Sequence, residues 1–561
     1  MRYVVAPEDE GGSGWLHAVD EAGVPVAEAE RVDDLVAAIA SRERTESPRW
    51  VLPSVEELYP RLLDAGVEIR RCVDLALTEG VLLAFDGRWG ASRSLGAAWA
   101  RLAGLPVPDD PAPPSRQAQQ SLFGAAVELP GGASAIDAAV AVHGEQLQRL
   151  SSLPSPERLR LLVAAESASA LVAAEMTRDG VPWRADVHDV VLTELLGPRP
   201  PAGLPPRRLT ELADRVAEAF GGHRLNPDSP AEVMQAFARA GMPITSTRSS
   251  ALKRLDHPAV APLLQYKELA RLHAANGWSW LDTWVRHGRF RPDWVVGGVV
   301  SGRWASRGGG ALQIPHAVRR AVIADPGHVL VVTDAAQLEP RILAALAGDE
   351  RMAQAATATD LYSALAADAF DGDRSRAKVA MLGTLYGATG GDSAPVLATL
   401  RRRFPIAVAY VEAAARDGES GRLVRSRLGR TCPPPSSGWR EAQEQASLPG
   451  AGAAEQTRAR QTARDRGRFT RNFVVQASAA DWTAVMLAAL RRRLLDGAAP
   501  GAEIVLFLHD EVVLHCPAAT ATDASRVVAE SAEEATRLLF GATPVRFPFE
   551  AKVVTCYADA K

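Results

Sequence analysis

The chain has 561 residues, of which 47% are hydrophobic and 23% charged, a composition typical of a globular protein of roughly three to five domains. Its first seven residues lack the apolar stretch of a secretion signal, and we see no apolar run near the ~18 residues that span a bilayer. Its four cysteines are scattered, so we expect a cytoplasmic chain without disulfides. The net charge of −4, taken over the whole chain, argues against a nucleic-acid-binding protein.

The charge is unevenly distributed along the chain. Residues 1–150 hold 13 Arg or Lys and 23 Asp or Glu, a net of −10, so the remainder carries +6. Residues 421–471 hold 11 Arg against 4 acids. Such a segment can bind phosphates, although its composition alone favours a solvated surface loop. Only five of the 63 basic residues are lysines, so each lysine, Lys378 among them, stands out.

The first 115 residues alternate between strand and helix, which indicates an α/β domain. Trp50–Leu52 and Gly80–Ala84 read as strands, and the amphipathic stretch Val55–Ala65 as a helix between them. A Pro-rich linker follows at residues 106–114, and Ala- and Leu-rich sequence from Ala135 to Met176 predicts helix.

Residues 208–285 also read as helical, with a turn and helix cap at residues 226–230. The stretch includes three tryptophans, for which core packing is a better interpretation than base stacking: Trp278, Trp280 and Trp284. From Arg289 onward strands and helices alternate, and residues 431–455 read as loop.

The first stretch that could carry chemistry is an apolar strand that ends at Asp334 and is followed within a few residues by a helix. Pro340 suits the first turn of that helix, where its missing N–H costs little. A carboxylate at the end of a buried strand could hold a hard cation. Taken alone, an ordinary helix-capping aspartate is the simpler interpretation.

The second stretch is a predicted β-hairpin with His509, Asp510 and Glu511 at its tip, between the apolar runs 504–508 and 512–516. Acids beside a core need a metal, a cation or solvent, so a solvated turn remains an equal alternative. Two acids on separate strands could share two Mg²⁺ ions in a phosphoryl transfer.

The third stretch is a predicted helix with four residues spaced by four on one face: Arg374, Lys378, Leu382 and Tyr386. Two cations, an apolar side chain and an aromatic ring suit a triphosphate with a base stacked beyond it. A salt-bridged surface helix is the alternative, but positions 375–391 hold no acid that could pair with these cations along the helix. Lysine can also donate a proton to a departing pyrophosphate, which arginine in effect cannot.

The order of these motifs resembles family A DNA polymerases, the bacterial DNA polymerase I type, and most closely the actinobacterial proteins described as bifunctional 3′–5′ exonuclease/DNA polymerase. The family motif DYSQIELR resembles Asp334–Arg341, and VHDE resembles Leu508–Glu511. The fingers pattern R-x3-K-x3-F-x3-YG resembles the helix from Arg374 to Gly387. Further matches are Ser301-Gly302-Arg303 with Leu312–Pro315, and a helix bearing Arg468, Asn472 and Gln476.

The resemblance implies a role for each matched residue. Asp334 and Asp510, with the Ala335 carbonyl, would hold two Mg²⁺ ions, or Mn²⁺ in their place. The catalytic residues would be Asp334, Asp510, Lys378 and Glu511. Glu339 would exclude a ribose 2′-OH. The dNTP-binding residues would be Arg374, Lys378, Leu382, Tyr386, Glu339, Gln337 and His509. The residues that contact DNA would be Arg303, Gln313, Arg468, Asn472 and Gln476, with His509 also near the DNA.

The implied fold is a multidomain α+β right-hand polymerase with a degenerate RNase H-like α/β exonuclease domain at its N-terminus. Its parts would be exonuclease-like domain 1–115, helical connector 116–206, thumb 207–286, palm 287–345, fingers 346–465 and palm again 466–561. The chain would leave no room for a 5′ nuclease domain. No strand ends in the DxE of an active exonuclease, Asp9 is misplaced, and Tyr59 is followed by Asp64 one residue too far for YxxxD. We therefore expect proofreading to be lost.

The implied activity is template-directed DNA synthesis from dNTPs in repair or gap filling, by a monomer that works at the nucleoid and not at a membrane. Ala335 and Ala336 replace the family's Tyr-Ser, Leu382 replaces an aromatic residue, and no Asn follows Gln313. These departures bear on fidelity and speed. They also leave open an alternative, a catalytically weak polymerase fold that binds primer–template as a repair or replication accessory factor. A nuclease or a single-subunit RNA polymerase fits less well.

Overall fold

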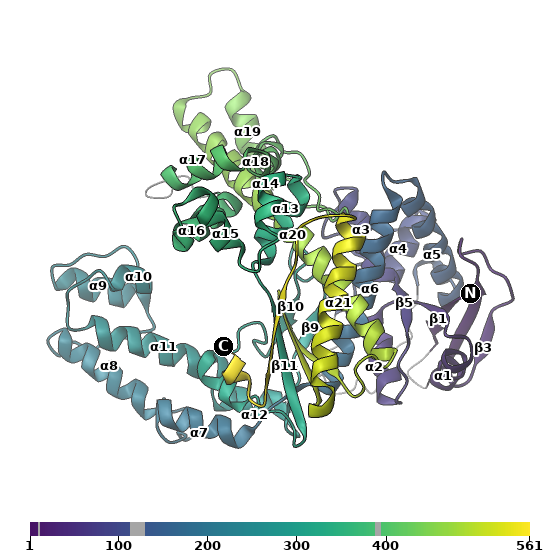
Figure 1. Cartoon of the computed structure of the whole chain (residues 1–561), viewed down its shortest axis with the longest axis horizontal. Helices are drawn as coiled ribbons and strands as arrows, with labels where there is room; N and C mark the ends of the chain where they lie inside the picture. The colour runs from purple at the N-terminus through teal and green to yellow at the C-terminus, as the bar shows by residue number, and fades with distance from the viewer. Residues whose placement is uncertain (9–11, 113–128, 388–393, 561) are drawn as a thin grey trace. The chain divides into compact units, whose positions relative to one another are not determined.

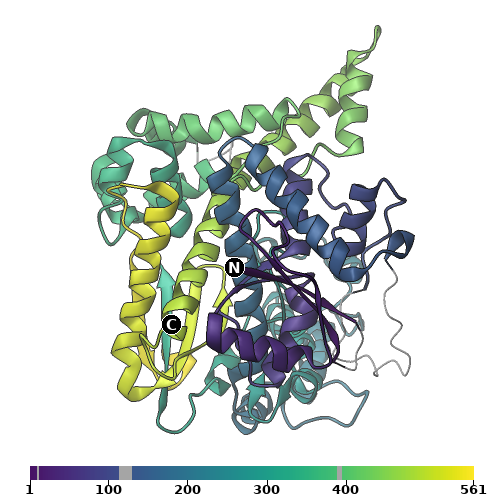
Figure 2. The same cartoon turned by 90° about the vertical axis from the view of Figure 1, so that its right-hand side faces the viewer.

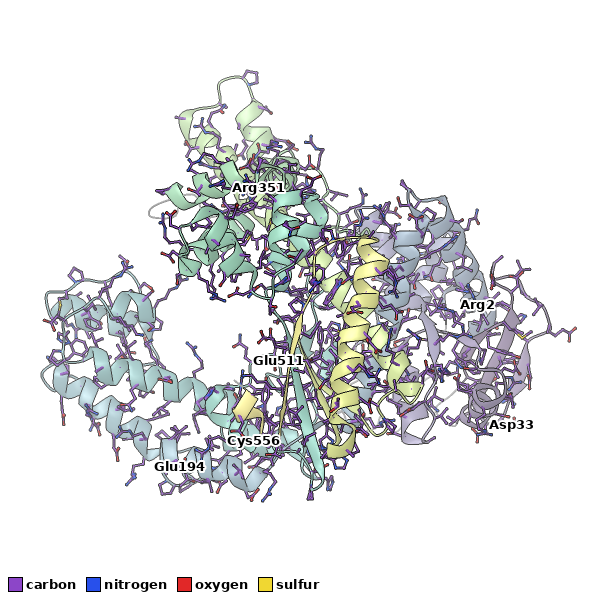
Figure 3. The ribbon with its side chains drawn as sticks, viewed as in Figure 1. Arg2, Asp33, Glu194, Arg351, Glu511 and Cys556 are labelled. Atoms are coloured by element: carbon purple, nitrogen blue, oxygen red, sulfur yellow. The ribbon has the colours of Figure 1, made fainter. Side chains whose placement is uncertain are left out.

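The computed structural model describes residues 1–8, 12–112, 129–387 and 394–560. These residues form two compact units (Figure 1), and Figure 3 adds their side chains. Unit 1 comprises residues 1–178, 294–305 and 333–551, and unit 2 comprises residues 179–293, 306–332 and 552–561. The polymerase parts expected from the sequence are a finer division, and their boundaries stay a prediction.

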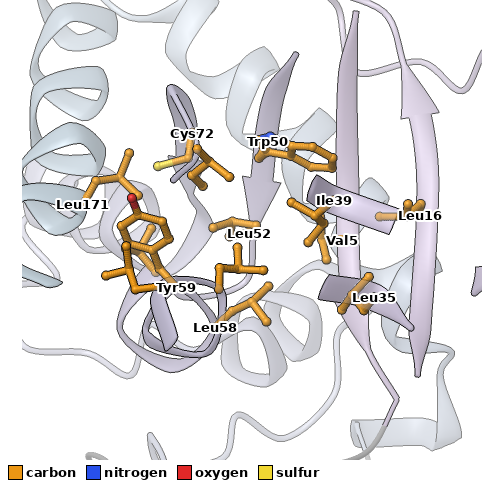
Figure 4. Close-up of a cluster of buried hydrophobic side chains, with 14 residues drawn as sticks. Val5, Leu16, Leu35, Ile39, Trp50, Leu52, Leu58, Tyr59, Cys72 and Leu171 are labelled. Carbon is orange, nitrogen blue, oxygen red and sulfur yellow. The ribbon is translucent and has the colours of Figure 1, made fainter. Parts of the chain in front are cut away.

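Unit 1 begins with a five-stranded sheet in the order β3-β2-β1-β4-β5. β1 pairs antiparallel with β2 and parallel with β4, which pairs parallel with β5. The strands are β1 (Arg2–Pro7), β2 (Gly14–Val19), β3 (Glu30–Val32), β4 (Arg49–Leu52) and β5 (Arg71–Asp74). The helices are α1 (Leu35–Glu46), α2 (Val55–Asp64), α3 (Leu75–Phe85) and α4 (Leu95–Ala103). One face of the sheet packs on α1, α2 and Leu171 in a core that includes Trp50 and Tyr59 (Figure 4).

The predictions for the first 115 residues are confirmed at β4 and α2 and wrong at Gly80–Ala84, which lies inside α3. An apolar run of this length is compatible with a strand or with a buried helix. Here the Asp74 carboxylate accepts a hydrogen bond from the Leu77 N–H, which caps a helix, and Leu82 and Leu83 are buried in its interior.

The predicted helix from Ala135 to Met176 is two helices, α5 (Ala135–Ser152) and α6 (Pro156–Asp179). The interruption is the segment Leu153-Pro154-Ser155, in which Ser155 has a φ of 57°. Proline disfavours helix in the residue before it, so the first helix ends there. Figure 2 shows these helices beside the N-terminal sheet.

The rest of unit 1 contains most of the four-stranded sheet β12-β13-β11-β14 and a large group of helices. The strands are β11 (His328–Ala335), β12 (Glu503–Leu508), β13 (Glu511–Pro517) and β14 (Phe549–Val554), with β9 (Asp293–Val295) and β10 (Ala305–Arg307) paired separately. The helices are α13 (Leu338–Ala347), α14 (Glu350–Ala355), α15 (Leu361–Ala369), α16 (Arg374–Tyr386), α17 (Ala394–Arg403), α18 (Pro405–Glu419), α19 (Ser437–Ser447), α20 (Ala453–Leu495) and α21 (Ala521–Phe540).

The prediction of loop at residues 431–455 is wrong in its middle, where α19 forms. Ser436 caps this helix by accepting a hydrogen bond from the Trp439 N–H, and prolines and glycines bound it on both sides. The prolines and glycines on both sides led to a prediction of loop for the whole segment, although α19 itself consists largely of good helix formers.

The longest helix, α20, has 43 residues and runs without a break through the boundary expected at 465/466. It contains an 18-residue window with a mean hydropathy of 1.5, which by length and composition alone could cross a membrane. The expectation that the chain has no such apolar run is therefore wrong. Of that window, 89% is buried inside the protein, as in the core helix of a folded domain.

Unit 2 is largely helical, as predicted for residues 208–285. Its helices are α7 (Ala185–Leu196), α8 (Arg207–Ala219), α9 (Pro230–Arg239), α10 (Ser249–Leu252), α11 (Val260–Asn276) and α12 (Trp278–Trp284), and its small sheet has the order β6-β8-β7, from β6 (Val181–Pro182), β7 (Val285–Arg286) and β8 (Arg289–Phe290). Ser229 caps α9, as expected. Trp278 and Trp280 are buried, which confirms core packing for both, and Trp284 is half-buried.

Candidate active site

The two aspartates singled out in the sequence lie close together at one edge of the sheet, one at the end of β11 and the other in the adjacent hairpin turn. β11 ends at Asp334 and Ala335, and Asp510 lies in the turn between β12 and β13, as both motifs predicted. The Ala335 N–H donates to the Asp510 carbonyl at 3.0 Å, and one residue earlier the Thr333 hydroxyl donates to the Val512 carbonyl at 2.8 Å. These bonds fix the end of β11 against the hairpin (Figure 3 labels Glu511 there), and so bring the backbones of Asp334 and Asp510 together.

The hairpin turn has a strained backbone at His509. Its φ is 61°, and the Asp510 N–H donates to the Leu508 carbonyl at 2.7 Å, which makes a γ-turn around a non-glycine residue. Such a residue costs roughly 1–3 kcal/mol and persists where its surroundings over-determine it, most often at functional sites. Burial and then the nearby Arg303 charge lower the pKa of His509, so its imidazole is neutral at pH 7.

A cavity of about 230 Å³ opens beside this turn. Its lining comes from the turn, from the start of α13, from α16 and from α20, and it includes Arg303, Gln337, Glu339, Leu382, Tyr386, His509 and Asp510. The structure therefore brings together seven of the residues predicted for the site, from segments that are far apart in the sequence.

Glu339 is the most connected side chain of this cavity. Its carboxylate forms an ion pair with Arg303 and accepts a hydrogen bond from the Tyr386 hydroxyl at 2.8 Å. Burial, followed by the Glu339 charge, raises the pKa of Tyr386 to about 12, so the hydroxyl stays protonated and keeps donating. The ion pair and the hydrogen bond hold Glu339 in one orientation at the mouth of the cavity.

A buried ionic network that the sequence did not reveal lies beside Gly302, the residue before Arg303. Arg430 pairs with Glu166 at 2.5 Å and with Asp481 at 2.9 Å, all three almost fully buried. Gly302 has a φ of +85°, and a Cβ there would lie 2.3 Å from the Arg430 Nε. Only glycine fits at this position, which explains the Ser-Gly-Arg motif ahead of Arg303.

Arg341 belongs to the first motif but had no predicted role. It is fully buried, and its guanidinium donates to the carbonyls of Ala336, Ala356, Ala358, Thr359 and Arg546 and to the side chain of Gln337. Burial lowers its pKa to about 10, so it remains charged at pH 7. The Gln337 side chain also accepts a hydrogen bond from the Leu361 N–H, so it links α13 to the start of α15, and its own backbone has a φ of 54°.

The helix α16 carries the predicted face. Leu382 and Tyr386 line the cavity, whereas Arg374 and Lys378 are exposed beyond it. Arg374 forms an ion pair with Asp360 at 2.7 Å. Arg374 is thus salt-bridged, as in the alternative interpretation of this helix, but its partner lies at the start of α15 and not on α16 itself. Lys378 has no hydrogen bond or ion pair with any described residue.

Asp360 caps α15 and gave no sequence signal beyond that of an ordinary cap. It accepts hydrogen bonds from the Tyr362 and Ser363 N–H groups as well as pairing with Arg374. Burial opposes ionisation, but the hydrogen bonds from Arg374 and Ser363 outweigh it and lower the pKa of Asp360 to about 2.

The predicted DNA-contacting residues lie in different places. Arg468, Asn472 and Gln476 lie on α20, where Arg468 is exposed and pairs with Asp465. The Asn472 Oδ1 is buried and accepts no hydrogen bond from the described residues. Gln313 is exposed in unit 2, and its contact with DNA stays a prediction.

Asp334 and Asp510 are the residues that could hold a metal here. Within residues 1–8, 12–112, 129–387 and 394–560, no group of three or more His, Cys, Asp or Glu side chains is arranged to do so. A carboxylate pair still fits Mg²⁺, which proteins commonly bind through one or two carboxylates plus substrate phosphates. Glu511 is almost fully buried at the start of β13, and the roles of Glu511 and of the Ala335 carbonyl stay predictions.

The N-terminal domain uses Tyr59, and also the buried acid Asp74 at the end of β5, for structure. Asp74 is buried and accepts from the N–H groups of Val55 and Leu77. The Tyr59 hydroxyl donates to Glu175 at 2.5 Å and accepts from Arg491. Asp9 lies outside the described residues.

Comparison with known proteins places this geometry in a family. The model of DNA polymerase family A matches residues 206–556, well over half of the chain. The chain belongs to DNA polymerase family A. This membership confirms the family inferred from the motifs, since the matched segment contains all of them.

Individual family A members are similar over part or all of the chain. DNA polymerase I of Thermus filiformis is 28% identical over 341 residues, which are 55% of this chain and 37% of that protein, and that of Thermus aquaticus is 26% identical over 388 residues, 61% and 43%. The aligned part thus spans about two fifths of these relatives. The POL domain of Pol1 from M. smegmatis, in complex with DNA primer-template and dNTP, has a TM-score of 0.74 at 19% identity, covering 100% of this chain and 95% of that one. This match confirms the multidomain polymerase fold.

Proposed function

We propose that the chain adds dNTPs to the 3′ end of a primer under the direction of a template strand. The primer 3′-oxygen would attack the α-phosphorus, the bond from that phosphorus to the β-phosphate oxygen would break, and pyrophosphate would leave. The observation that carries this proposal is the convergence of Asp510, Glu339 and Tyr386 on one cavity beside the end of β11, in a family A chain.

Each group would act through its chemistry. Asp334 and Asp510 would hold divalent cations, Mg²⁺ or Mn²⁺, which when bound would offset phosphate charge and activate the primer hydroxyl. Arg374 and Lys378 would bind the triphosphate, and Lys378 could protonate the departing pyrophosphate. Glu339 would exclude a 2′-hydroxyl, while Leu382 and Tyr386 would pack against the nascent base pair.

The proposal is tested by extension of a labelled primer on a DNA template with Mg²⁺ and all four dNTPs, with EDTA as the control. We expect extension to the template end with Mg²⁺ and none with EDTA. A parallel binding titration separates this function from that of an accessory factor. Tight primer–template binding without incorporation in either Mg²⁺ or Mn²⁺ would reject synthesis.

The Asp360–Arg374 ion pair predicts a change in dNTP affinity. Asp360 is ionised at any neutral pH, so Arg374 must leave it to reach a triphosphate. Asp360→Asn keeps a good capping side chain and removes the charge. We expect the KM for dNTP to fall by about 2–5-fold with little change in kcat, in line with the worth of an exposed pair. Asp373→Asn, at the cap of α16, is the matched control, and an equal fall in KM there would reject the explanation.

The N-terminal domain predicts the absence of proofreading. The purified protein should leave the 3′ end of a labelled single strand intact with Mg²⁺ or Mn²⁺ and no dNTPs. The physical reason is that Asp74 and Tyr59 are engaged in buried hydrogen bonds. Stepwise 3′ degradation that survives Asp510→Ala, and so does not arise at the polymerase site, would contradict this prediction.

A further inference from the structure

Three arginines stand in a row at the start of the parallel strands of the N-terminal sheet. Arg2 of β1 is in register with Arg49 of β4, and Arg49 is in register with Arg71 of β5. Neighbouring strands lie about 4.8 Å apart, so the row is roughly 10 Å long. Residues in register point to the same face of a sheet, so the three guanidinium groups leave the sheet on one side.

That side is the face covered by α5. Trp50 and Cys72, each one residue further along, belong to the core on the opposite face (Figure 4), and Tyr3 packs against that core. Alternation along a strand therefore directs the arginines away from that core. Consistent with this placement, the Arg2 Nη1 lies 3.1 Å from the Nε2 of His143 in α5, and Figure 3 labels Arg2 at this end of the sheet.

Among the residues that the structure describes, these arginines have no carboxylate partner. Arg2, Arg49, Arg71 and also Arg160 of α6 form no ion pair with any described residue, and the only side-chain hydrogen bond of Arg71 goes to the Ser47 carbonyl. Burial lowers the pKa of Arg49, and the charges of Arg2 and Arg71 lower it further. Arg2 and Arg49 are partly buried, whereas Arg71 and Arg160 are exposed. Like charges that repel one another destabilise the protein, most of all where they are partly buried, unless an anion offsets them.

The acids nearest to the row do not neutralise it. Glu21 and Asp20 raise the pKa of Arg2, but burial outweighs them, and Arg160 adds to the lowering. Both acids are exposed, and the Asp20 carboxylate accepts hydrogen bonds from the N–H groups of Ala22 and Val24 in its own turn. The row thus stays cationic within a domain whose first 150 residues carry a net charge of −10.

His143 contacts Arg2 without neutralising its charge. A guanidinium group can only donate, so the His143 Nε2 must accept from Arg2 and the ring proton lies on Nδ1. Burial and the charges of Arg2 and Arg49 lower the pKa of His143 to about 4, so the ring is neutral at pH 7. Its Nδ1 is buried and bonds to no described residue.

We propose that Arg2, Arg49, Arg71 and Arg160, here called the arginine cluster, bind phosphate oxyanions. Guanidinium forks match phosphate oxygens, and a row of three suits two or more linked phosphates. The ligand is either a free oligophosphate or consecutive phosphates of a nucleic-acid strand. Arg2, Arg49 and Arg71 lie at the amino ends of β1, β4 and β5, and none of them belongs to a polymerase or exonuclease motif, so the proposal does not depend on either activity.

The first arm of the test measures the thermal stability of the full chain with inorganic tripolyphosphate, in EDTA and at constant ionic strength. We expect saturating tripolyphosphate to raise the Tm by at least about 2 °C, because a ligand of the folded state stabilises it. Arg2→Gln/Arg71→Gln should lose most of this shift. Arg44→Gln/Arg88→Gln, which removes two exposed arginines of the same domain, is the matched control and should keep it. Arg49→Gln should lose the shift without lowering the Tm of the ligand-free protein, which separates ligand binding from folding.

The second arm measures the affinity of the same proteins for labelled (dT)20 over a range of salt concentrations. If the cluster binds a strand, Arg2→Gln/Arg71→Gln should reduce the slope of log K against log salt by about 1.4, since each phosphate contact contributes about 0.7 on single strands. A loss confined to tripolyphosphate identifies a free oligophosphate as the ligand. The proposal would be overturned if tripolyphosphate did not raise the Tm of the original protein. It would also be overturned if Arg2→Gln/Arg71→Gln and Arg44→Gln/Arg88→Gln gave equal responses in both arms.

Discussion

Asp510→Ala is expected to lower the rate of primer extension by about 10³-fold or more. The Asp510 carboxylate is one of the two that could hold the cations of nucleotidyl transfer, and loss of that electrostatic support removes several kcal/mol, at a tenfold change per 1.36 kcal/mol. The measurement is single-turnover insertion of one dNTP with Mg²⁺. DNA binding should be retained, because the hydrogen bond from Ala335 to the residue at 510 uses its backbone carbonyl.

The control for this prediction is Glu533→Gln, which removes an exposed carboxylate of α21 and should leave the rate unchanged. Asp334→Ala should match Asp510→Ala in its effect. A loss of less than about tenfold in both aspartate variants, with normal folding, would show that the cations are held elsewhere.

Glu339→Ala is expected to admit ribonucleotides. In the cavity the Glu339 carboxylate is fixed by Arg303 and by the Tyr386 hydroxyl, so it cannot swing aside for a 2′-hydroxyl. We expect the preference for dNTP over rNTP, as a ratio of kcat/KM values, to fall by about 10–100-fold, which is the range of a single steric contact in a pocket. Insertion of one dNTP and of the matching rNTP opposite the same template base measures it.

Tyr386→Phe tests whether the ribose is excluded by the Glu339 carboxylate itself or by the tyrosine hydroxyl that positions this carboxylate. It removes one hydrogen bond and leaves the carboxylate paired with Arg303, so discrimination should fall only about 2–10-fold, as expected for one hydrogen bond. If Tyr386→Phe lost as much discrimination as Glu339→Ala, the hydroxyl, and not the carboxylate, would be the group that excludes the ribose.

The elements that carry the site could be predicted because their signals are local. The local signals are an apolar strand ending at Asp334, apolar runs on both sides of the turn at His509, and the spacing along α16, and each lies within a short segment. The order of these motifs along the chain then predicted the family. The β-hairpin with Asp510 at its tip follows from the same kind of short segment.

The contacts between segments could not be predicted in this way. Asp360 is an ordinary helix cap in the sequence, and its pairing with Arg374 depends on how α15 packs against α16. Arg341 and Arg430 look like two arginines among many in an Arg-rich chain, and only the fold shows that each is buried among acceptors. The arginine cluster likewise depends on strand register, which composition and spacing do not determine.

The overall charge had argued against nucleic acid, and the structure shows why the sum misleads. The acidic first 150 residues belong to the sheet and helices that precede the family A segment, while the basic excess lies beyond them. Two of the acids in that later part, Asp334 and Asp510, are proposed cation ligands, so they would not repel DNA.

The most direct test of the proposed function is single-nucleotide insertion by the full chain on four primer–templates that differ only in the templating base. Each dNTP is supplied alone with Mg²⁺, and the ratio of insertion rates is measured. We predict that each template directs insertion of its complementary nucleotide. No insertion on any template, or addition of the same nucleotide on all four, would contradict template-directed synthesis.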